Sequence, residues 1–317
     1  MAKVLIVQPI APEGIQLLED QGFEVKQLSQ HDPDTLKREV ADADALLVRD
    51  ARIPREVIEA GHKLKVISRH GAGLEKIDVQ AATGRGIYVT YTPIANSVSV
   101  AEHVLGMMLI LTKNILKVDH FLREGDFEVR HRIYGAELEG KTLGIIGLGN
   151  VGQRLAKKAI HGMEMSVIGF DPFVKAEILD PAILLSSKWD RIFQESDFVS
   201  LHLPLNEKTR GLIGKREFHW MKKTAFFINC ARGKIIVEEA LIQALRERVI
   251  AGAGVDVYSI TPPPKDNPLW TMENTVVTPH YAAHTREAMV KMATQAAQGI
   301  IEVLNGTRPT WAVNQIR

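Results

Sequence analysis

The chain has 317 residues, a formal net charge of +1, and ordinary shares of apolar (45%) and charged (24%) residues. This length predicts two domains, each able to bury its own core. A charge so close to zero leaves no electrostatic footprint for nucleic acid or an anionic membrane, so neither is an expected partner. The single cysteine, Cys230, excludes an internal disulfide and is typical of the reducing cytoplasm. The N-terminus has the pattern of a first strand and not of a signal peptide.

The first hundred residues alternate short apolar runs with polar–apolar segments. The runs predict strands at 4–8, 23–28, 45–48, 65–68 and 88–90, and segments such as 13–21 and 34–41 predict helices between them. This order predicts a small doubly wound α/β unit with a parallel sheet. Two features of this predicted unit could form an anion-binding site. Arg49 and Arg52 can hold an anion or form surface ion pairs, and the turn at 69–73 can hold a carboxylate or be a plain tight turn.

A linker at 92–97 precedes a long apolar segment. Ser99 and Glu102 have the spacing of a capping box at the start of the next helix. The most apolar stretch, 104–116, is shorter than a membrane span and has charged residues at or near its ends. We therefore expect a buried or dimer-facing helix there.

A glycine-rich turn at 147–152 lies between a strand-like run, 141–147, and an amphipathic helix-like segment. In such a turn Gly147 permits the tight bend, Gly149 lets the backbone approach a pyrophosphate, and Gly152 lets the helix pack closely on the strand. The helix N-terminus then offers free N–H groups to the phosphates. The turn by itself is a weak signal, but its flanking strand and helix make it typical of dinucleotide binding.

An acid follows at the end of the next predicted strand, 165–171. Asp171 lies about 20 residues beyond the last glycine, where a carboxylate can bind a ribose 2′-hydroxyl. A 2′-phosphate would be repelled by this carboxylate, and only Lys175 nearby could favour it. The sequence therefore predicts NAD rather than NADP as cofactor.

Further strands are predicted at 198–201, 225–229, 252–256 and 275–277, and a last helix at 285–304. Polar clusters follow three of these strands, at 229–233, at Asp256 and at 278–280, where parallel sheets bind ligands. Arg232 can fork a carboxylate, or be a surface or capping arginine. His280 can transfer a proton, or be a structural histidine. His280 and His284 have metal-pair spacing but lack a third ligand, so no metal is expected.

Together these segments resemble the D-isomer-specific 2-hydroxyacid dehydrogenase family, which includes D-3-phosphoglycerate dehydrogenases and glyoxylate/hydroxypyruvate reductases. The matching segments span nearly the whole chain in the family's order. They are 67–78, 92–97, 100–103, 147–152, 202–205 with Thr209, 229–233, 254–257 and 278–280.

The resemblance implies a Rossmann NAD domain, residues 99–285, inserted in a flavodoxin-like substrate domain formed by 1–98 and 286–317, with the active site in the cleft. It implies that Arg232 orients the substrate, that His280 is the acid/base, and that the protein is a homodimer through its NAD domain. The implied substrate-binding residues are Ala72, Gly73, Ser97 and Arg232. The implied NAD-binding residues are Gly147, Gly149, Asn150, Val151, Gly152, Asp171, His202, Pro204, Thr209, Cys230, Ala231 and Asp256, of which Asp256 would contact the nicotinamide carboxamide.

Two positions depart from the family pattern. The family's catalytic glutamate is replaced by Thr261, which removes a carboxylate that would keep His280 protonated. Glu238 stands where the family has an aspartate, which conserves the charge. The leading interpretation is an NAD-dependent enzyme that interconverts a 2-oxo acid and its D-2-hydroxy acid. The alternatives are a D-3-phosphoglycerate dehydrogenase proper and a catalytically weak NAD-sensing protein. Arg49 favours the first of these alternatives, but the adjacent Asp50 would repel a phosphate.

Overall fold

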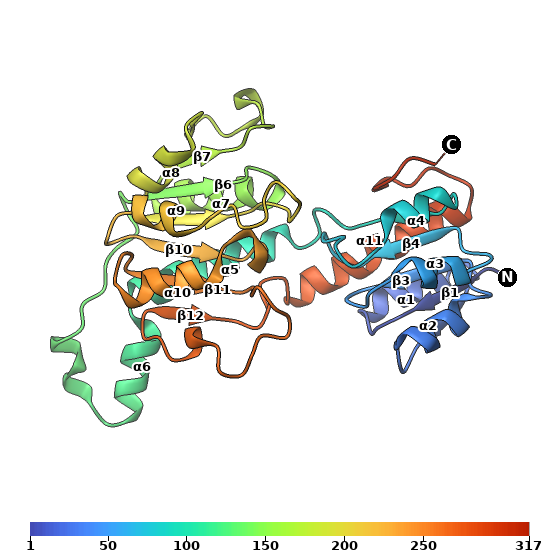
Figure 1. Cartoon of the computed structure of the whole chain (residues 1–317), viewed down its shortest axis with the longest axis horizontal. Helices are drawn as coiled ribbons and strands as arrows, with labels where there is room; N and C mark the ends of the chain where they lie inside the picture. The colour runs from blue at the N-terminus through green and yellow to red at the C-terminus, as the bar shows by residue number, and fades with distance from the viewer. Residues whose placement is uncertain (317) are drawn as a thin grey trace. The chain divides into compact units, whose positions relative to one another are not determined.

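The computed structural model describes residues 1–316 and divides the chain into two compact units. Met1–Asn96 and His284–Arg317 form one, here called the terminal unit, and Ser97–Ala283 form the other, the inserted unit. From the sequence we expect the chain to divide after residues 98 and 285, which is two residues later than each division in the structure. Figure 1 shows both units and labels the helices and most of the strands.

The terminal unit is a five-stranded parallel sheet in the order β2-β1-β3-β4-β5, which is the flavodoxin-like order. Its strands are β1 (Lys3–Ile6), β2 (Glu24–Gln27), β3 (Ala45–Val48), β4 (Val66–Arg69) and β5 (Tyr88–Thr90). Successive residues of β1 enter different cores: Val4 and Ile6 pack with one set of helices, and Leu5 packs with the other. The sheet is therefore buried on both faces, as the continuous apolar runs require.

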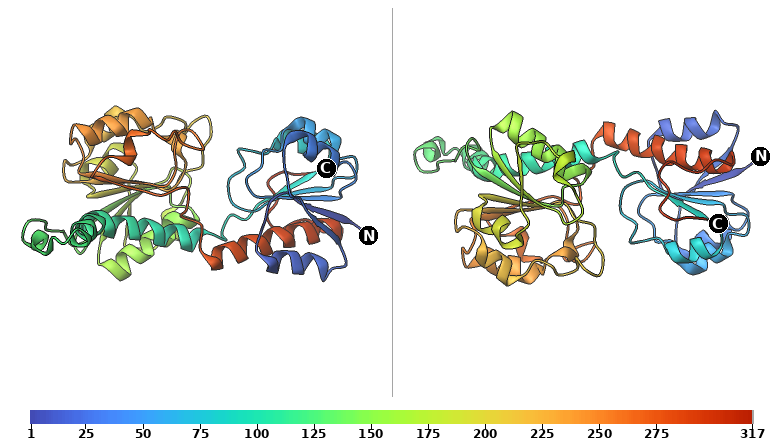
Figure 2. Two further views of the ribbon diagram at one scale, coloured as in Figure 1. Left: turned by 90° about the horizontal axis from the view of Figure 1, so that it is seen from below. Right: turned by 90° about the horizontal axis from the view of Figure 1, so that it is seen from above.

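Helices cover both faces of this sheet (Figure 2). One face carries α1 (Pro12–Glu19) and α11 (Arg286–Leu304), and the other carries α2 (Pro33–Val40), α3 (Arg55–Ala60) and α4 (Val79–Gly84). Because α11 packs on β3, β4 and β5, the C-terminal segment of the chain completes the core of the N-terminal sheet.

The inserted unit is a seven-stranded parallel sheet in the order β12-β11-β10-β9-β6-β7-β8. Its strands are β6 (Thr142–Ile146), β7 (Ser166–Phe170), β8 (Ile183–Leu185), β9 (Phe198–Leu201), β10 (Phe226–Asn229), β11 (Gly252–Val255) and β12 (Thr275–Val277). The strand order reverses at β6, which pairs with both β7 and β9. Open parallel sheets bind ligands outside the carboxyl ends of their strands at such a switch point.

Helices also cover both faces of the inserted sheet (Figure 2). One face carries α5 (Ser97–Thr112) and α7 (Asn150–Met163), and the other carries α8 (Trp189–Glu195), α9 (Lys215–Trp220) and α10 (Glu238–Arg246). Short 3-10 turns lie at η1 (Phe127–His131), η2 (Ala176–Ile178), η3 (Gly233–Ile235) and η4 (Pro268–Trp270). The predicted fold class, two doubly wound parallel-sheet domains, is confirmed.

The strand predictions are confirmed to within two residues at each end, but β8 was missed. It has three residues, and Leu184 in its centre is half exposed. So short a strand at the edge of a sheet gives too few residues for an apolar run or an alternation to be seen.

The predicted start and end of the long apolar helix are wrong. Because α5 begins at Ser97, Ser99 lies inside the helix, and its hydroxyl donates to the carbonyl of Ala282 at 2.6 Å instead of capping. The helix ends at Thr112, since Asn114 adopts a left-handed conformation (φ 54°), and α6 (Ile115–Arg123) begins after it.

The expectation that this apolar segment is buried is confirmed for α5, which packs on α7 and on the sheet. Within the described residues, no single helix is long and apolar enough to cross a membrane. The pair α5 and α6, bent by 58°, passes that test only together, by length and composition.

Candidate functional site

The glycine-rich turn joins β6 to α7, and two of its glycines are required by close packing. Gly147 has φ 95°, and a Cβ on it would lie 2.5 Å from the carbonyl oxygen of His202. A Cβ on Gly152 would lie 2.0 Å from the carbonyl oxygen of Gly147. The first turn of α7 therefore packs directly against the backbone of the loop, which no side chain would permit.

Among the described residues, no side chain caps the N-terminus of α7. Its N-cap residue is Gly149, and nothing lies within 4 Å of where its Cβ would be. A helix N-terminus with its positive dipole end, following a glycine-rich turn, is typical of a phosphate-binding site. Asn150 and Val151 are the first two residues of this helix.

Asp171 follows β7 and connects two loops. Its Oδ2 accepts from the N–H of Leu148 at 2.9 Å, and its Oδ1 accepts from the N–H groups of Phe173 at 2.9 Å and Val174 at 3.3 Å. A carboxylate has about four acceptor sites, so one remains for a hydroxyl group. The carboxylate is thus fixed beside the glycine-rich turn, where the ribose of a dinucleotide would lie. The residues present fit the cofactor.

The loop after β9 holds three predicted cofactor residues. The Nε2 of His202 lies 2.9 Å from the hydroxyl of Ser200, and burial lowers the pKa of His202 to about 3, so its ring is neutral. The hydroxyl of Thr209 donates to the carbonyl of Pro204 at 2.7 Å and accepts from the N–H of Asn206 at 2.9 Å. Thr209 and Pro204 therefore fix the shape of the loop.

Arg232 is positioned by the loop that follows β10. The side chain of Asn229 accepts from the N–H of Ala231 at 3.0 Å and donates to the carbonyl of Arg232 at 3.2 Å. A Cβ on Gly233 would lie 2.0 Å from the backbone of Tyr258, so the loop packs tightly against the segment that follows β11. The guanidinium of Arg232, half-buried, donates to the carbonyl of Ala231 at 2.7 Å.

Asp256, at the end of β11, organises the segment that carries His280. Its carboxylate is fully buried and accepts from the hydroxyl of Thr278 at 2.5 Å and from the N–H groups of Tyr281 and Ala282 at 2.6 and 3.0 Å. Its carbonyl accepts from the N–H of His280 at 2.8 Å. His280 itself has φ 58°, and its side chain is exposed. The three predicted clusters thus lie at the ends of three adjacent strands.

The buried carboxylate of Glu238, which was not among the predicted site residues, binds both sides of the loop that contains Thr261. Glu238 accepts from the N–H of Ser259 at 2.8 Å and from the side chain of Asn267 at 3.1 Å, which brackets the loop between them. Thr261 is exposed in this loop. The only sequence signal was the departure from the family pattern at position 238.

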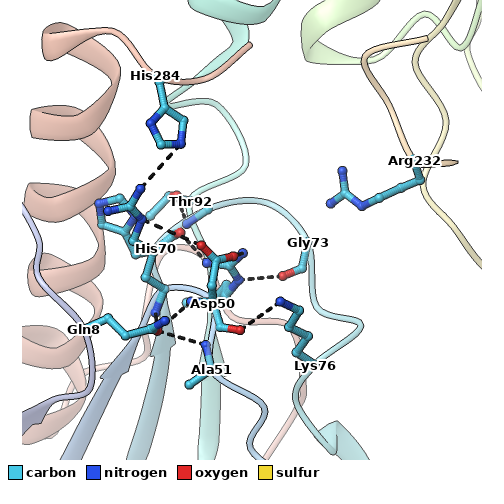
Figure 3. A network of polar contacts seen from close by, with 12 residues as sticks. Gln8, Asp50, Ala51, His70, Gly73, Lys76, Thr92, Arg232 and His284 are labelled. Atoms are coloured by element: carbon cyan, nitrogen blue, oxygen red, sulfur yellow. Dashed lines mark hydrogen bonds and ion pairs between the residues drawn. The ribbon is translucent and has the colours of Figure 1, made fainter. Parts of the chain in front are cut away.

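The predicted substrate residue Gly73 lies in a polar network of the terminal unit, shown in Figure 3, and Ala72 precedes it in the chain. Gln8 accepts from three successive N–H groups, those of Arg49, Asp50 and Ala51. The other contacts in the network are Arg69 Nε to the carbonyl of Gly73 (2.8 Å), the N–H of Gly71 to the hydroxyl of Thr92 (2.9 Å), Lys76 Nζ to the carbonyl of Asp50 (2.9 Å) and Arg49 Nη2 with His284 Nε2 (3.4 Å).

The network leaves the turn after β4 rich in donors. Within residues 1–316, the N–H groups of Ala72 and Gly73 have no hydrogen-bond acceptor. Asp50 lies between two cations, 3.8 Å from Arg49 and 3.7 Å from Arg69. The fourth predicted substrate residue, Ser97, is buried at the start of α5.

Comparison with known proteins identifies the family. Residues 105–282 match the family model described as D-isomer specific 2-hydroxyacid dehydrogenase, NAD binding domain. The chain is also 42% identical, over 99% of its length, to the D-3-phosphoglycerate dehydrogenase of Methanocaldococcus jannaschii, of which it covers 60%. The chain belongs to the D-isomer specific 2-hydroxyacid dehydrogenase family. The resemblance inferred from the sequence and the expected NAD-binding domain are both confirmed.

Other members of this family differ in name and length. The chain is 37% identical over 99% of its length to the glyoxylate reductase of Thermofilum pendens and covers 94% of it. In contrast, it spans between half and three-fifths of six curated D-3-phosphoglycerate dehydrogenases, including that of Methanocaldococcus jannaschii.

Solved structures agree with the family assignment. A protein from Thermus thermophilus superposes with a TM-score of 0.91 at 31% identity, covering 98% of this chain and all of the other. The NAD+-bound 3-phosphoglycerate dehydrogenase of Entamoeba histolytica superposes with a TM-score of 0.84 at 30% identity, covering 100% of this chain and 99% of that one.

Proposed function

We propose that this protein is an NAD-dependent dehydrogenase that interconverts a 2-oxo acid and its D-2-hydroxy acid. The observation that supports it most is the arrangement at the ends of β10, β11 and β12. A guanidinium, a buried carboxylate and an exposed histidine follow three adjacent strands, and the backbone of Asp256 directly binds the segment that carries His280. Family membership supports the same reaction class.

The proposed cofactor residues follow β6, β7, β9, β10 and β11 of the inserted sheet, on both sides of its switch point. When bound, the cofactor supplies or accepts a hydride. The N–H groups at the start of α7 would hold the pyrophosphate, Asp171 the ribose hydroxyl, and Asp256 the nicotinamide carboxamide. The remaining proposed contacts are Gly147, Gly149, Asn150, Val151, Gly152, His202, Pro204, Thr209, Cys230 and Ala231.

Arg232 and His280 are proposed to act on the substrate. The planar guanidinium of Arg232 binds the substrate carboxylate through two parallel hydrogen bonds and polarises the adjacent carbonyl. During reduction His280 gives its proton to the carbonyl oxygen, and during oxidation its neutral ring takes the hydroxyl proton. Ala72, Gly73 and Ser97 stay predicted substrate-binding residues, on the family resemblance.

The test is NADH oxidation by the full chain with a panel of 2-oxo acids that includes glyoxylate, hydroxypyruvate and phosphohydroxypyruvate. We expect turnover of at least one of them, a D-2-hydroxy acid as product, and a preference for NADH over NADPH. An NADPH preference would contradict the proposed role of Asp171. NADH binding without turnover of any 2-oxo acid would overturn the enzyme and favour an NAD-sensing protein.

A second candidate, a D-3-phosphoglycerate dehydrogenase proper, is supported by the cations around Asp50. Arg49, Arg69 and Lys76 converge on this residue, and a phosphate could compete with it for them. If phosphohydroxypyruvate is the substrate, Arg49→Ala should raise its KM by about tenfold or more and leave the KM for glyoxylate nearly unchanged. The exposed Arg38→Ala is the control. An equal effect on both substrates would remove Arg49 from phosphate recognition.

We also propose a homodimer formed through the inserted unit. Apolar side chains that are roughly half or more exposed cluster on α6 and the segment after it: Ile115, Leu116, Leu122, Phe127 and Tyr134. A patch of this kind is typical of an interaction surface. Leu116→Glu combined with Leu122→Glu should convert the dimer to a monomer in sedimentation experiments. Leu184→Glu, on an equally exposed leucine at the other edge of the sheet, should not. A wild-type monomer would overturn the proposal.

A further inference from the structure

Three metal-ligating side chains from separate elements meet beneath the carboxyl ends of β10 and β11. They are His103 of α5, Cys230 after β10 and Asp256 after β11, and their ligand atoms all lie within 4.8 Å of one another. The Nε2 of His103 is 3.9 Å from Oδ1 of Asp256 and 3.1 Å from the hydroxyl of Thr278. Because these residues are far apart in the sequence, no motif of fixed spacing predicts the cluster.

The donor types are those of a zinc site. An imidazole nitrogen, a thiolate and a carboxylate are the ligands that Zn²⁺ uses, and three protein ligands leave a fourth position for water. The thioether of Met107 lies 3.8 Å from the sulfur of Cys230, so the surroundings are also rich in soft sulfur, which favours thiophilic ions. One thiolate and one carboxylate would neutralise the charge of a divalent ion in this buried place.

The geometry is close to what such an ion requires. With metal–ligand bonds of about 2.0–2.3 Å, the donor atoms of a tetrahedral site lie about 3.3–3.7 Å apart. The largest separation in the cluster, up to 4.8 Å, would therefore contract by at most about 1.5 Å. His103 is 19% exposed, whereas Cys230 and Asp256 are buried, so the imidazole side is the route of entry. The carboxylate of Asp256 accepts three hydrogen bonds and retains capacity for another partner.

We propose that His103, Cys230 and Asp256 form a site for a thiophilic divalent cation, Zn²⁺ or Cd²⁺, whose occupation is incompatible with bound dinucleotide. Binding replaces the thiol proton of Cys230, which is released to solvent, and involves no change of oxidation state. The incompatibility rests on the proposed contacts of Cys230 and Asp256 with the cofactor. An ion held between these two side chains would take the carboxylate that the nicotinamide carboxamide needs. Binding of Zn²⁺ or Cd²⁺ at this site would therefore inhibit the proposed dehydrogenase activity.

The first experiment is a titration of the full chain with Cd²⁺ in the absence of cofactor, followed by the ultraviolet absorption of the cadmium–thiolate bond. The chain has one cysteine, so any such absorption reports Cys230. We expect saturation at about one ion per chain, release of about one proton, and affinity that rises with pH.

Variants separate this site from adventitious binding. Cys230→Ser should abolish the absorption, and His103→Ala should weaken binding about tenfold or more. His219→Ala, on the exposed histidine of α9, is the matched control and should change nothing. Absence of the thiolate absorption, or an identical titration for His103→Ala, would overturn the site. These readouts need neither cofactor nor substrate, so their failure is distinct from failure of the proposed dehydrogenase.

The second experiment tests exclusion of the cofactor. NADH should remove the cadmium–thiolate absorption, and Zn²⁺ should lower the apparent affinity for NADH in wild type but much less in His103→Ala. Simultaneous binding of Cd²⁺ and NADH would overturn the exclusion.

Discussion

At the scale of single residues, Arg232 is held by contacts within its own loop. One of its N–H groups binds the carbonyl of Ala231, and Asn229 fixes the backbone on both sides of it. Lysine would keep the charge but lose the two parallel donors. We therefore predict that Arg232→Lys lowers kcat/KM for the 2-oxo acid by about two orders of magnitude, the worth of a charged hydrogen-bond pair.

Steady-state kinetics with the preferred 2-oxo acid, together with NADH titration, checks this prediction. NADH affinity should change little, since the proposed role of Arg232 is toward the substrate. Arg246→Lys, on an exposed arginine of α10, is the control for charge and fold. Full activity in Arg232→Lys would remove this residue from the mechanism.

Thr261 stands at the position where the family resemblance implies a catalytic glutamate. It carries no charge, whereas a carboxylate facing His280 would raise the pKa of that histidine. In the proposed mechanism reduction requires protonated His280, so its rate should fall at a lower pH here than in a relative with glutamate. We predict that Thr261→Glu moves the alkaline limb of reduction to higher pH.

The measurement is kcat/KM against pH for reduction, under conditions where chemistry limits the rate. Thr261→Gln is the matched variant, because it has the size of glutamate without the charge and should leave the limb in place. If Thr261→Glu folds and binds NADH but its limb does not move, position 261 does not face His280 or another carboxylate supplies the charge. Glu238 would then be the first residue to test, because it is buried and binds the same loop.

At the scale of elements, the junction between β6 and α7 sets how closely helix and turn approach. A methyl group on Gly152 would meet the carbonyl of Gly147 at 2.0 Å, so α7 would have to shift. Gly152→Ala should therefore destabilise the protein by about 1–3 kcal/mol, as overpacking does, and weaken NADH binding. At the other end of the same helix, Gly162 has open space around it. Gly162→Ala should stabilise by up to about 1 kcal/mol.

Chemical denaturation and NADH titration of the two glycine variants check this contrast. Both add one methyl group to α7, so helix propensity alone would shift them in the same direction. Equal stabilisation by both substitutions would show that the helix does not pack on the turn as closely as the structure has it.

These elements also show what the sequence can predict. The inner strands of both sheets are largely apolar, because parallel strands are buried on both faces, and their ends follow from these runs. The edge strand β2 differs, since it is mostly polar and exposed. Knowing that parallel strands end at one edge was enough to group Arg232, Asp256 and His280. In contrast, the hydrogen bonds of Glu238 to Ser259 and Asn267 join separate loops, and no periodicity encodes them. The cluster of His103, Cys230 and Asp256 escaped prediction for the same reason.

At the scale of the whole molecule, the chain buries a neutral histidine in each unit. His202 lies in the inserted unit, and His70 lies in the terminal unit with 2% of its surface exposed. Within the described residues, the Nε2 of His70 has no hydrogen-bond partner. Burial, together with the positive charges of Arg49 and Arg69, lowers the pKa of His70 to about 4. A proton on this ring is thus strongly disfavoured in the folded state.

The consequence is a stability that declines in acid. Above a pH of about 6.5 the ring is neutral in both folded and unfolded chains, so the contribution is fully present. As the pH falls below this value the unfolded chain takes up a proton and the folded chain does not, until the pH approaches the folded pKa of about 4. Between about pH 7.5 and pH 5.5 the free energy of unfolding of the terminal unit should fall by roughly 1.3 kcal/mol because of His70.

We predict that His70→Gln removes this loss, since glutamine has no proton to gain. Hydrogen exchange of the buried amides of β3 and β4, measured in the full chain at both pH values, reports the terminal unit alone. The amides of β9 and β10 in the inserted unit should respond to acid equally in wild type and variant, because His202 is unchanged, and they serve as an internal reference. His62→Gln, on an exposed histidine of the terminal unit, should behave as wild type. If His70→Gln keeps the full acid dependence of wild type in β3 and β4, His70 does not stay neutral in the folded protein, and another group causes the decline.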